Sequence, residues 1–340
     1  MFALTVAITT RNRAAFIGET LDSILPQLTD SVELLVLDGA STDRTPEVIR
    51  SYQDRGARIR YIRLETNDGP DRDFNRSVEN ASGEYCWLMT DDDLFKPGAI
   101  ARVLRAVSES HSLIIVNAEV RNADLSRIIE PRRLKTTRDR VFLPAERDEL
   151  FAHTADYLSF LGGVVIKRSV WLGRSREPYF GSLFIHFAVI FQDVLPGSAL
   201  AIAEPLISIR YGNALWRPRD FEIWAFRWPQ LVWSFSDISE SARRAICPRE
   251  PWRRVSTLAL FRAKGGYSLR EYRGWLRPLA LTRLEKATAI VIACLPGVVA
   301  NVAAVVYCST IRRDKRTSLL DLRSSRFYPS NWWRAALSRE

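Results

Sequence analysis

The sequence predicts an α/β fold in which a mostly parallel sheet is flanked by helices. The chain has 340 residues, of which 47% are hydrophobic, so it can bury a core of ordinary size. Over residues 1–120, apolar runs with strand character alternate with helical patterns. Strands and helices that alternate at this spacing form right-handed crossovers, which place successive strands parallel in one sheet.

Each element of this first part has its own signal. Five apolar runs predict strands at Leu4–Thr9, Val32–Leu37, Ile59–Leu64, Tyr85–Met89 and Leu113–Val116. Four helical patterns lie between them, at Ala14–Leu25, Pro46–Arg55, Arg72–Ala81 and Pro97–Val107. Pro46 and Pro97 are expected at the first helical position, where the backbone N–H that proline lacks is not needed.

Acidic segments follow the predicted strands, at the edge where a parallel sheet binds its ligands. Eight aspartates are expected there: Asp38, Asp43, Asp68, Asp71, Asp73, Asp91, Asp92 and Asp93. Asp43 and Asp68 are of the type that caps a following helix. The three adjacent acids of 91–93 exceed any capping need, and they raise one another's pKa unless a cation compensates them. Such hard carboxylate oxygens suit Mg²⁺ or Mn²⁺.

Cysteine and histidine content excludes several classes of protein. The four cysteines form no C-x-x-C pair, and the chain has only three histidines. A disulfide scaffold, a zinc ribbon and an H-E-x-x-H metallopeptidase are therefore excluded, and a reducing compartment is expected. The amino-terminal segment has no basic region ahead of its apolar run, so no signal peptide is expected.

Charge is distributed unevenly along the chain. The formal net charge is +10, yet residues 1–110 hold 13 basic against 18 acidic side chains. Residues 241–340 hold 20 basic against 6 acidic ones. An acidic front is therefore joined to a strongly basic back, which is compatible with nucleic acid, anionic lipid or simple solubility.

Three segments of the front half resemble glycosyltransferase family 2, in the family's order and spacing: VAITTRNR, VLDGASTDRT and GEYCWLMTDDDLFKPGAI. The segment GPDRDFNRSVENASGEYCWLMTDDD is similar to the abequosyltransferase-like branch, which builds bacterial O-antigen. The resemblance covers residues 1–120 well and 160–215 loosely. It implies a GT-A domain over 1–215, with nucleotide-sugar binding in 1–120 and the acceptor side in 121–215. Residues 216–340 would form a basic, helical, membrane-associating region.

The resemblance also implies roles for individual residues. Thr9 and Arg11 would lie by the nucleotide, and Asp38 would accept a hydrogen bond from its base. Asp91 and Asp93 would match the D-x-D motif, with Asp93 as the direct ligand of Mn²⁺ or Mg²⁺. Further contacts to the nucleotide-sugar are expected from a set of polar residues around these: Asp71, Arg72, Asp73, Arg76 and Asp92.

One triplet departs from the family pattern. Many relatives carry A-R-N before the fourth strand, and its arginine helps to hold the diphosphate. The aligned triplet here is Asp73-Phe74-Asn75, with Arg72 and Arg76 on either side. Either of these arginines could take over the phosphate contact.

An inverting transfer needs a general base that deprotonates the acceptor hydroxyl. After a predicted strand within 161–171, relatives carry an acidic pair where this chain has His186 in an apolar, helix-like run. His186 could be the base or a core histidine, and Asp193 is the alternative base. His111 and His153 have no comparable context and are expected to be structural.

The back of the chain is rich in tryptophan and arginine. Trp224, Trp228 and Trp233 are expected in a core, although they could line an acceptor groove. Residues 287–311 are 25 uncharged positions, enough to cross a bilayer, with Pro296-Gly297 and Asn301 inside. Basic residues on both flanks favour a re-entrant or in-plane hairpin over a full crossing. A buried hairpin of a soluble domain is the alternative.

Together these features predict an inverting, metal-dependent glycosyltransferase. Its donor would be a nucleotide-sugar and its acceptor a polyprenyl-diphosphate-linked glycan, at the cytoplasmic face of the bacterial inner membrane, with no nucleic acid as partner. A nucleotidyltransferase is one alternative, but TTRNR lacks the glycines of its phosphate loop. The other is a non-enzymatic basic protein that binds membranes or polyanions through residues 241–340.

Overall fold

The computed structural model describes residues 2–213, 217–310 and 316–330, which divide into two compact units. Unit 1 comprises Met1–Tyr211 and Phe235–Ile246, and unit 2 comprises Gly212–Ser234 and Cys247–Glu340. The main division therefore falls close to the expected boundary at 215. The sequence analysis did not foresee that residues 235–246 return to unit 1.

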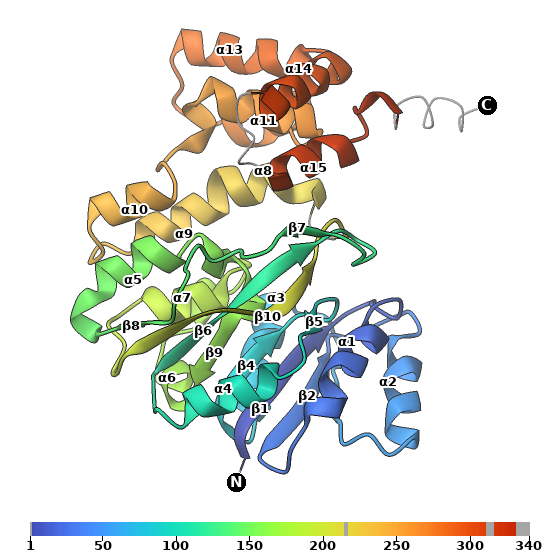
Figure 1. Cartoon of the computed structure of the whole chain (residues 1–340). Helices are drawn as coiled ribbons and strands as arrows, with labels where there is room; N and C mark the ends of the chain where they lie inside the picture. The colour runs from blue at the N-terminus through green and yellow to red at the C-terminus, as the bar shows by residue number, and fades with distance from the viewer. Residues whose placement is uncertain (1, 214–216, 311–315, 331–340) are drawn as a thin grey trace. The chain divides into compact units, whose positions relative to one another are not determined.

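Unit 1 is built on a single sheet (Figure 1). Its main path runs in the order β3-β2-β1-β4-β9-β6-β10-β5, while β7 pairs with β6 and β8 with β10. The strands of the described chain are β1 (Phe2–Thr10), β2 (Val32–Asp38), β3 (Arg60–Arg63), β4 (Gly83–Met89), β5 (Leu94–Phe95), β6 (Leu113–Arg121), β7 (Ile128–Glu130), β8 (Arg140–Phe142), β9 (Val164–Lys167) and β10 (Ala199–Arg210). All five strands predicted from the sequence are present.

The pairing confirms a mostly parallel sheet. Strand β1 lies parallel between β2 and β4, and β6 lies parallel to β10. Strand β9 is antiparallel to both β4 and β6, so it joins the two parallel groups without reversing their direction. The carboxyl ends of β1, β2, β4, β6 and β10 therefore meet at one edge, which we call the acidic edge.

Helices connect the strands of unit 1, as the alternating pattern predicts. They are α1 (Ile17–Ile24), α2 (Thr45–Asp54), α3 (Pro70–Asn80), α4 (Ala99–Val107), α5 (Arg147–Thr154), α6 (Arg168–Leu172) and α7 (Ile185–Phe191). Helix α10 (Glu240–Ile246) also belongs to unit 1 but follows the last strand. Pro46 lies in the first turn of α2. The prediction for Pro97 was wrong, because α4 begins only at Ala99, after Gly98 takes a left-handed φ of 81°.

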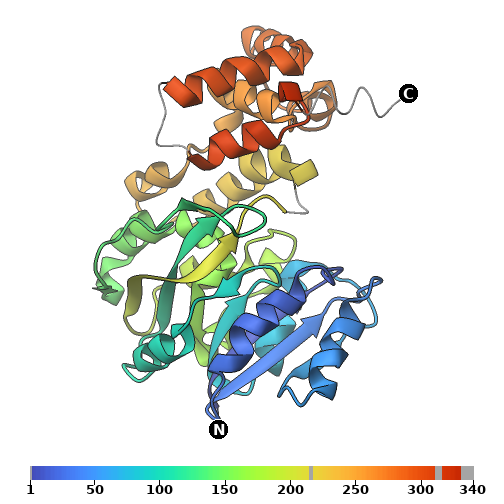
Figure 2. The same ribbon diagram turned by 45° about the vertical axis from the view of Figure 1, so that its right-hand side comes forward.

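Unit 2 is helical in its described part (Figure 2). Its helices are α8 (Asp220–Glu222), α9 (Trp228–Ser234), α11 (Val255–Lys264), α12 (Leu269–Glu271), α13 (Arg283–Cys294), α14 (Gly297–Thr310) and α15 (Arg316–Ser324). Trp228 is buried, as expected for a core tryptophan, whereas Trp224 and Trp233 are half-buried. The uncharged stretch forms α13 and α14, and its last residue, Ile311, lies outside the described residues.

Candidate functional site at the acidic edge

The loops after β1 and β2 are joined by hydrogen bonds. The Asn12 side-chain oxygen accepts from the Thr42 N–H at 2.7 Å, and the Asn12 N–H donates to Ser41 Oγ at 2.9 Å. Asp43 accepts from the Ala14 N–H and, at the start of α2, from the Thr45 N–H. Asp43 therefore accepts from the first residue of α2, although the N-cap position itself is Arg44, and these bonds join the two loops.

Asp38 ends β2 with its side chain fully buried. One carboxylate oxygen accepts the Ser41 N–H at 2.8 Å, and the other accepts the Tyr61 hydroxyl at 2.7 Å. Burial, followed by this bond to Asp38, raises the pKa of Tyr61, so its hydroxyl stays a donor. The sequence analysis missed Tyr61, because a tyrosine within a short strand carries no signal of its own.

Arg13 crosses from the loop after β1 to the acids that follow β4. Its guanidinium lies 3.3 Å from an Asp91 carboxylate oxygen and 3.2 Å from an Asp92 carboxylate oxygen. Burial raises the pKa of Asp91, and the charge of Asp92 adds to this rise while Arg13 opposes it. The sequence analysis did not single out Arg13, which supplies positive charge to two adjacent buried carboxylates.

Asp93 is used differently from its neighbours. One of its oxygens accepts the Thr90 hydroxyl at 2.5 Å, and the other accepts the Arg210 N–H at 2.7 Å. The Arg210 side chain in turn donates to the Asp92 backbone carbonyl and pairs with Glu19. Asp93 thus attaches the end of β10 to the loop after β4, and each of its oxygens accepts one hydrogen bond.

Asp73, in the first turn of α3, is buried against the loop after β2. A Cβ at Gly39 would lie 2.4 Å from one Asp73 oxygen, so only glycine leaves room for this carboxylate. The other oxygen is buried without a hydrogen-bond partner. Burial raises the pKa of Asp73 to about 6, although the charges of Arg76 and Arg11 act in the opposite direction. The same oxygen lies 4.0 Å from the Arg76 guanidinium. A buried acceptor that makes no hydrogen bond within the protein is suited to a ligand.

The other polar residues of α3 have partners within the protein. Arg76 pairs with Asp68, so Asp68 does not cap α3 as predicted; its partner is a side chain of the helix instead. The Arg72 guanidinium lies over the Phe180 ring, 4.3 Å from its centre. Thr9 is half-buried and Arg11 is exposed at the end of β1. The structure brings all of these residues to the acidic edge.

The Asp71 carboxylate accepts hydrogen bonds from the backbone of residues 181–185. It accepts the Gly181 and Leu183 N–H groups, each at 2.8 Å, and the Ile185 N–H at 3.1 Å. Leu183 has a φ of 71°, which its side chain tolerates because this loop is held in place. The predicted nucleotide contact for Asp71 is therefore replaced by a structural role: it fixes the entry into α7.

His186 lies in the first turn of α7 and is 2% exposed. Its Nε2 lies 2.8 Å from the Leu158 carbonyl, to which it donates, and its Nδ1 is buried without a partner. Burial lowers the pKa of His186 to about 4, so the ring is neutral at pH 7. Of the two roles that the sequence leaves open, these surroundings favour the core histidine.

Asp193 lies at the opposite end of the sheet from the acidic edge. It follows α7 and precedes Ala199, which starts β10 beside Leu113 at the amino end of β6. Its side chain is 75% exposed and pairs with Arg174 at 3.3 Å. The candidate base Asp193 was therefore wrong, because α7 carries the chain away from the edge before this residue is reached.

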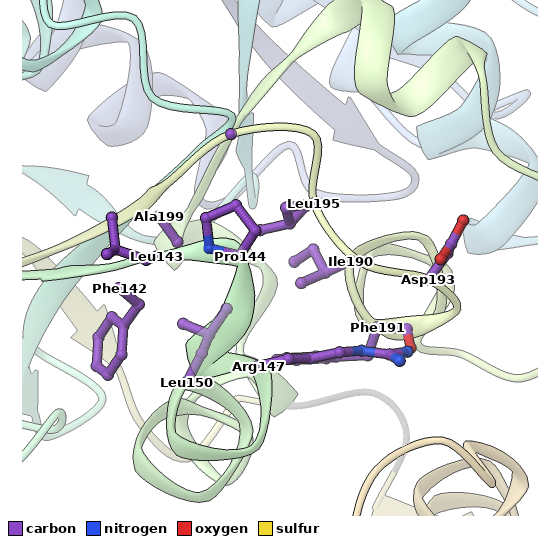
Figure 3. A pocket seen from close by; sticks show the side chains of 11 residues that line it. Phe142, Leu143, Pro144, Arg147, Leu150, Ile190, Phe191, Asp193, Leu195 and Ala199 are labelled. Carbon is purple, nitrogen blue, oxygen red and sulfur yellow. The ribbon is translucent and has the colours of Figure 1, made fainter.

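A small cavity near Asp193 is not a substrate site. Figure 3 shows its mainly apolar lining, with Arg147 and Asp193 on one side and Phe142 on the other. Its volume is about 10 Å³, which is room for about one water molecule.

Comparison with known proteins gives this edge its context. The family model described as glycosyl transferase family 2 matches residues 5–164, which include the carboxyl ends of β1, β2, β4 and β6 but not that of β10. This match, over slightly less than half of the chain, supports a family 2 glycosyltransferase. The chain is a glycosyltransferase.

Two curated relatives illustrate the range of similarity. The chain is 27% identical over 223 residues to the abequosyltransferase RfbV of Salmonella typhimurium, covering 62% of this chain and 67% of that protein. It is 29% identical over 115 residues to the GalNAc(5)-diNAcBac-PP-undecaprenol beta-1,3-glucosyltransferase of Campylobacter jejuni, covering 34% of this chain and 37% of that one. The second match spans well under two thirds of that relative.

Solved structures share the GT-A-like fold of this glycosyltransferase. The Staphylococcus aureus protein TarS 1–349, in complex with UDP, has a TM-score of 0.56 at 13% identity and covers 95% of this chain and 89% of its own. The mannosyltransferase PcManGT from Pyrobaculum calidifontis, in complex with GDP-Man and Mn²⁺, has a TM-score of 0.53 at 16% identity. The match covers 98% of this chain and 87% of PcManGT. At these identities the likeness concerns the fold alone.

Proposed function

We propose that this glycosyltransferase takes its sugar from a nucleotide-sugar and passes it, with inversion, to a lipid-linked glycan. The observation that carries the donor part is the buried Asp73 carboxylate at the acidic edge. One of its oxygens lies against Gly39, and the other accepts no hydrogen bond and lies 4.0 Å from the Arg76 guanidinium. A nucleotide base has N–H groups that can donate hydrogen bonds to such an oxygen. The exposed Arg11 nearby would attract the negatively charged diphosphate.

A divalent ion fits the acids after β4. Asp91 and Asp92 are mostly buried carboxylates that share the charge of Arg13, so excess negative charge remains for a cation to neutralise. Within the described residues, no three His, Cys, Asp or Glu side chains form a complete metal site. This suits Mg²⁺ or Mn²⁺, which bind through one or two carboxylates and complete their shell with water and substrate phosphate.

The assignment of ligands changes in one respect. The sequence favours Asp91 and Asp93. Each oxygen of Asp93 accepts one hydrogen bond, which leaves it a further lone pair for a cation. We propose Asp92, which lies between these two residues in the sequence, as an additional ligand. When bound, the ion would neutralise charge that develops on the departing nucleoside diphosphate. Arg13 would stabilise the same charge from the other side.

The acceptor part of the proposal rests on the relatives and on unit 2. The Campylobacter relative is named for an undecaprenol-linked substrate, and the back of the chain is strongly basic. An acceptor of this kind places the enzyme at the cytoplasmic face of the bacterial inner membrane. Anionic lipid there would attract the basic region.

The donor and the metal can be tested together by thermal unfolding. We expect one nucleoside diphosphate to raise the melting temperature of the protein only when Mn²⁺ or Mg²⁺ is present. A ligand at 100 times its dissociation constant stabilises the native state by about 2.7 kcal/mol, which gives a measurable shift. The nucleotide that does so identifies the donor class.

Asp92→Asn is the matching variant, because it keeps the shape of the side chain and removes its charge. The metal-dependent shift should be lost in Asp92→Asn and kept in Asp54→Asn, a control at an exposed acid of α2. If Asp92→Asn retains the full shift, the metal assignment is wrong. If no nucleotide shifts the wild-type protein, the donor proposal itself fails.

A further inference from the structure

An apolar surface is exposed on the two helices of the uncharged stretch. Val291 and Val299 are each 61% exposed, and Leu284 is 77% exposed. We call this surface the apolar face of α13–α14; its large exposed side chains are Leu284, Ile290, Val291, Leu295, Val299, Val302, Val306 and Tyr307. Contiguous apolar surfaces of this kind mark interaction sites in soluble proteins.

The opposite sides of the same helices are also apolar, but these are buried. Ala289, Ile292 and Ala293 of α13 belong to a core that includes Trp252 and Tyr267. In α14, Cys308 packs against Ala263 and Leu322. A helix of a water-soluble domain normally turns charged residues to the solvent, and Gly297–Thr310 contains none. The outward side of α14 therefore lacks the composition of a water-exposed helix.

The angle between the two helices is a built feature of unit 2. Helices α13 and α14 meet at 97°. The Arg262 guanidinium donates to the Leu295 carbonyl at the turn, at 2.8 Å from Nε. A Cβ at Gly297 would lie 2.5 Å from the Phe327 ring, so glycine is required for Phe327 to pack there. The bend is fixed by contacts on its inner side.

The bent pair differs from a straight membrane-spanning helix, although its two helices together have the length and composition of a broken span or a re-entrant loop. In the described residues no single helix is long and apolar enough to span a membrane. Helices of 12 and 14 residues are roughly 18 and 21 Å long, shorter than the roughly 30 Å hydrocarbon core. Asn301 is fully buried and donates to the Ala263 and Leu322 carbonyls. Straightening the pair would break these bonds and open the core.

The charge around the apolar face identifies its partner. Arg283 and Lys286 are exposed at the start of α13, on either side of Leu284 and Glu285. Arg270, Arg273 and Arg277 are exposed in the segment that precedes it. An anionic lipid surface offers an apolar layer beneath a negatively charged one, which matches exposed valines next to exposed cations.

We propose that the apolar face of α13–α14 lies in the interface of an anionic bilayer, with both helices parallel to the membrane plane. This deepens the proposed function and rests on it for its purpose, because it names the surface by which the enzyme would reach a lipid-linked acceptor. The binding itself needs no sugar transfer. Its test is therefore independent of donor, metal and turnover.

The test is sedimentation of the full chain with phospholipid vesicles. The wild-type protein should bind vesicles of phosphatidylglycerol and phosphatidylethanolamine, and bind phosphatidylcholine vesicles far more weakly. The variant Val299→Asp/Val302→Asp/Val306→Asp should bind the anionic vesicles at least tenfold more weakly, because charged groups then enter the apolar layer. A melting curve checks that the variant is folded, as expected for changes at exposed positions.

A matched control lies in unit 1. Val141 and Leu143 are 46% and 58% exposed, so Val141→Asp/Leu143→Asp makes the same chemical change away from α13–α14 and should leave vesicle binding unchanged. Three results would overturn the proposal. The first is equal binding by the triple variant, and the second is complete release of the wild type by salt alone. The third is a wild-type protein that is dimeric and does not bind vesicles, together with a triple variant that is monomeric.

Discussion

At the scale of the residue, aspartates of the same edge have different tasks because their neighbours differ. Asp38, Asp71 and Asp93 are occupied by hydrogen bonds from the protein. One buried oxygen of Asp73 accepts no hydrogen bond and lies 4.0 Å from the Arg76 guanidinium, and Asp92 shares the charge of Arg13 with its neighbour. The first three therefore stabilise the loops of the site, and which of the five also contact a ligand stays a prediction.

Asp71→Asn tests this division. The amide keeps one acceptor oxygen, but its NH₂ group cannot accept, so at least one N–H of the 181–185 segment loses its partner. Leaving a buried donor unpaired costs about 1–3 kcal/mol, which urea unfolding would detect. The metal-dependent binding of nucleotide should weaken less than in Asp92→Asn. A larger loss of nucleotide binding in Asp71→Asn would show that Asp71 contacts the ligand after all.

His186 predicts an acid-sensitive fold. Its pKa is about 4 in the folded protein and about 6.5 when unfolded, so the unfolded state binds more protons between these values. Its contribution to stability is therefore present above about pH 6.5 and is lost as the pH falls to about 4, by about 3 kcal/mol. His186→Gln, whose amide can still donate to Leu158, should remove this acid-dependent loss in unfolding measurements from pH 7.5 to 4.5.

The same variant separates the two roles of His186. A core histidine predicts nearly unchanged kcat in His186→Gln at pH 7.5. A general base predicts a fall of 10²-fold or more, with loss of the acidic limb of the pH profile, which the protonation of the base produces. That second outcome would restore the catalytic role despite the burial of the ring.

At the scale of the element, contacts between distant segments decide where helices and strands end. Strand β10 reaches the acidic edge because Arg210 is held by Asp93, and α7 starts where Asp71 accepts its first N–H groups. The end of α13 is held by Arg262. None of these three partners is close in sequence, so periodicity alone does not locate these ends.

Gly297→Ala tests the bend between α13 and α14. The new methyl group would meet three carbons of the Phe327 ring at 2.5 Å, so the ring must move. Overpacking of this kind costs about 1–3 kcal/mol, measurable as a lower melting temperature. Gly274→Ala is the control, because nothing lies within 4 Å of its added Cβ, and it should be neutral or slightly stabilising. Equal effects of both changes would contradict a packed turn.

At the scale of the whole molecule, charge and structure divide the chain in nearly the same place. The acidic front lies in the sheet-based unit 1, and most of the basic residues 241–340 lie in the helical unit 2. The exception is Phe235–Ile246, which returns to unit 1. Phe235 packs there against the rings of Phe187, Phe151 and Phe191, with centroids 5.8–6.5 Å away.

Phe235→Ala should therefore destabilise unit 1 although the residue follows the first segment of unit 2. Truncating a buried phenylalanine costs about 3–5 kcal/mol. Protection of β1 and β4 amides from hydrogen exchange should fall accordingly, and Phe235→Leu should retain most of it. A loss of protection confined to α11–α14 would show that residue 235 belongs with unit 2 instead.

The amino-acid sequence by itself determined the alternation of strands and helices, the acidic loops at the strand ends and the family. It did so because these depend on local periodicity and on short motifs, and because parallel strands bring their carboxyl ends together in any such sheet. Only the tertiary structure decided which acids accept hydrogen bonds from the protein and that His186 lies in the core. It also decided that Asp193 lies at the end of the sheet opposite the acidic edge and that the α13–α14 pair is bent. These depend on partners as far away in sequence as Asp93 and Arg210, and no local pattern encodes a contact over that separation.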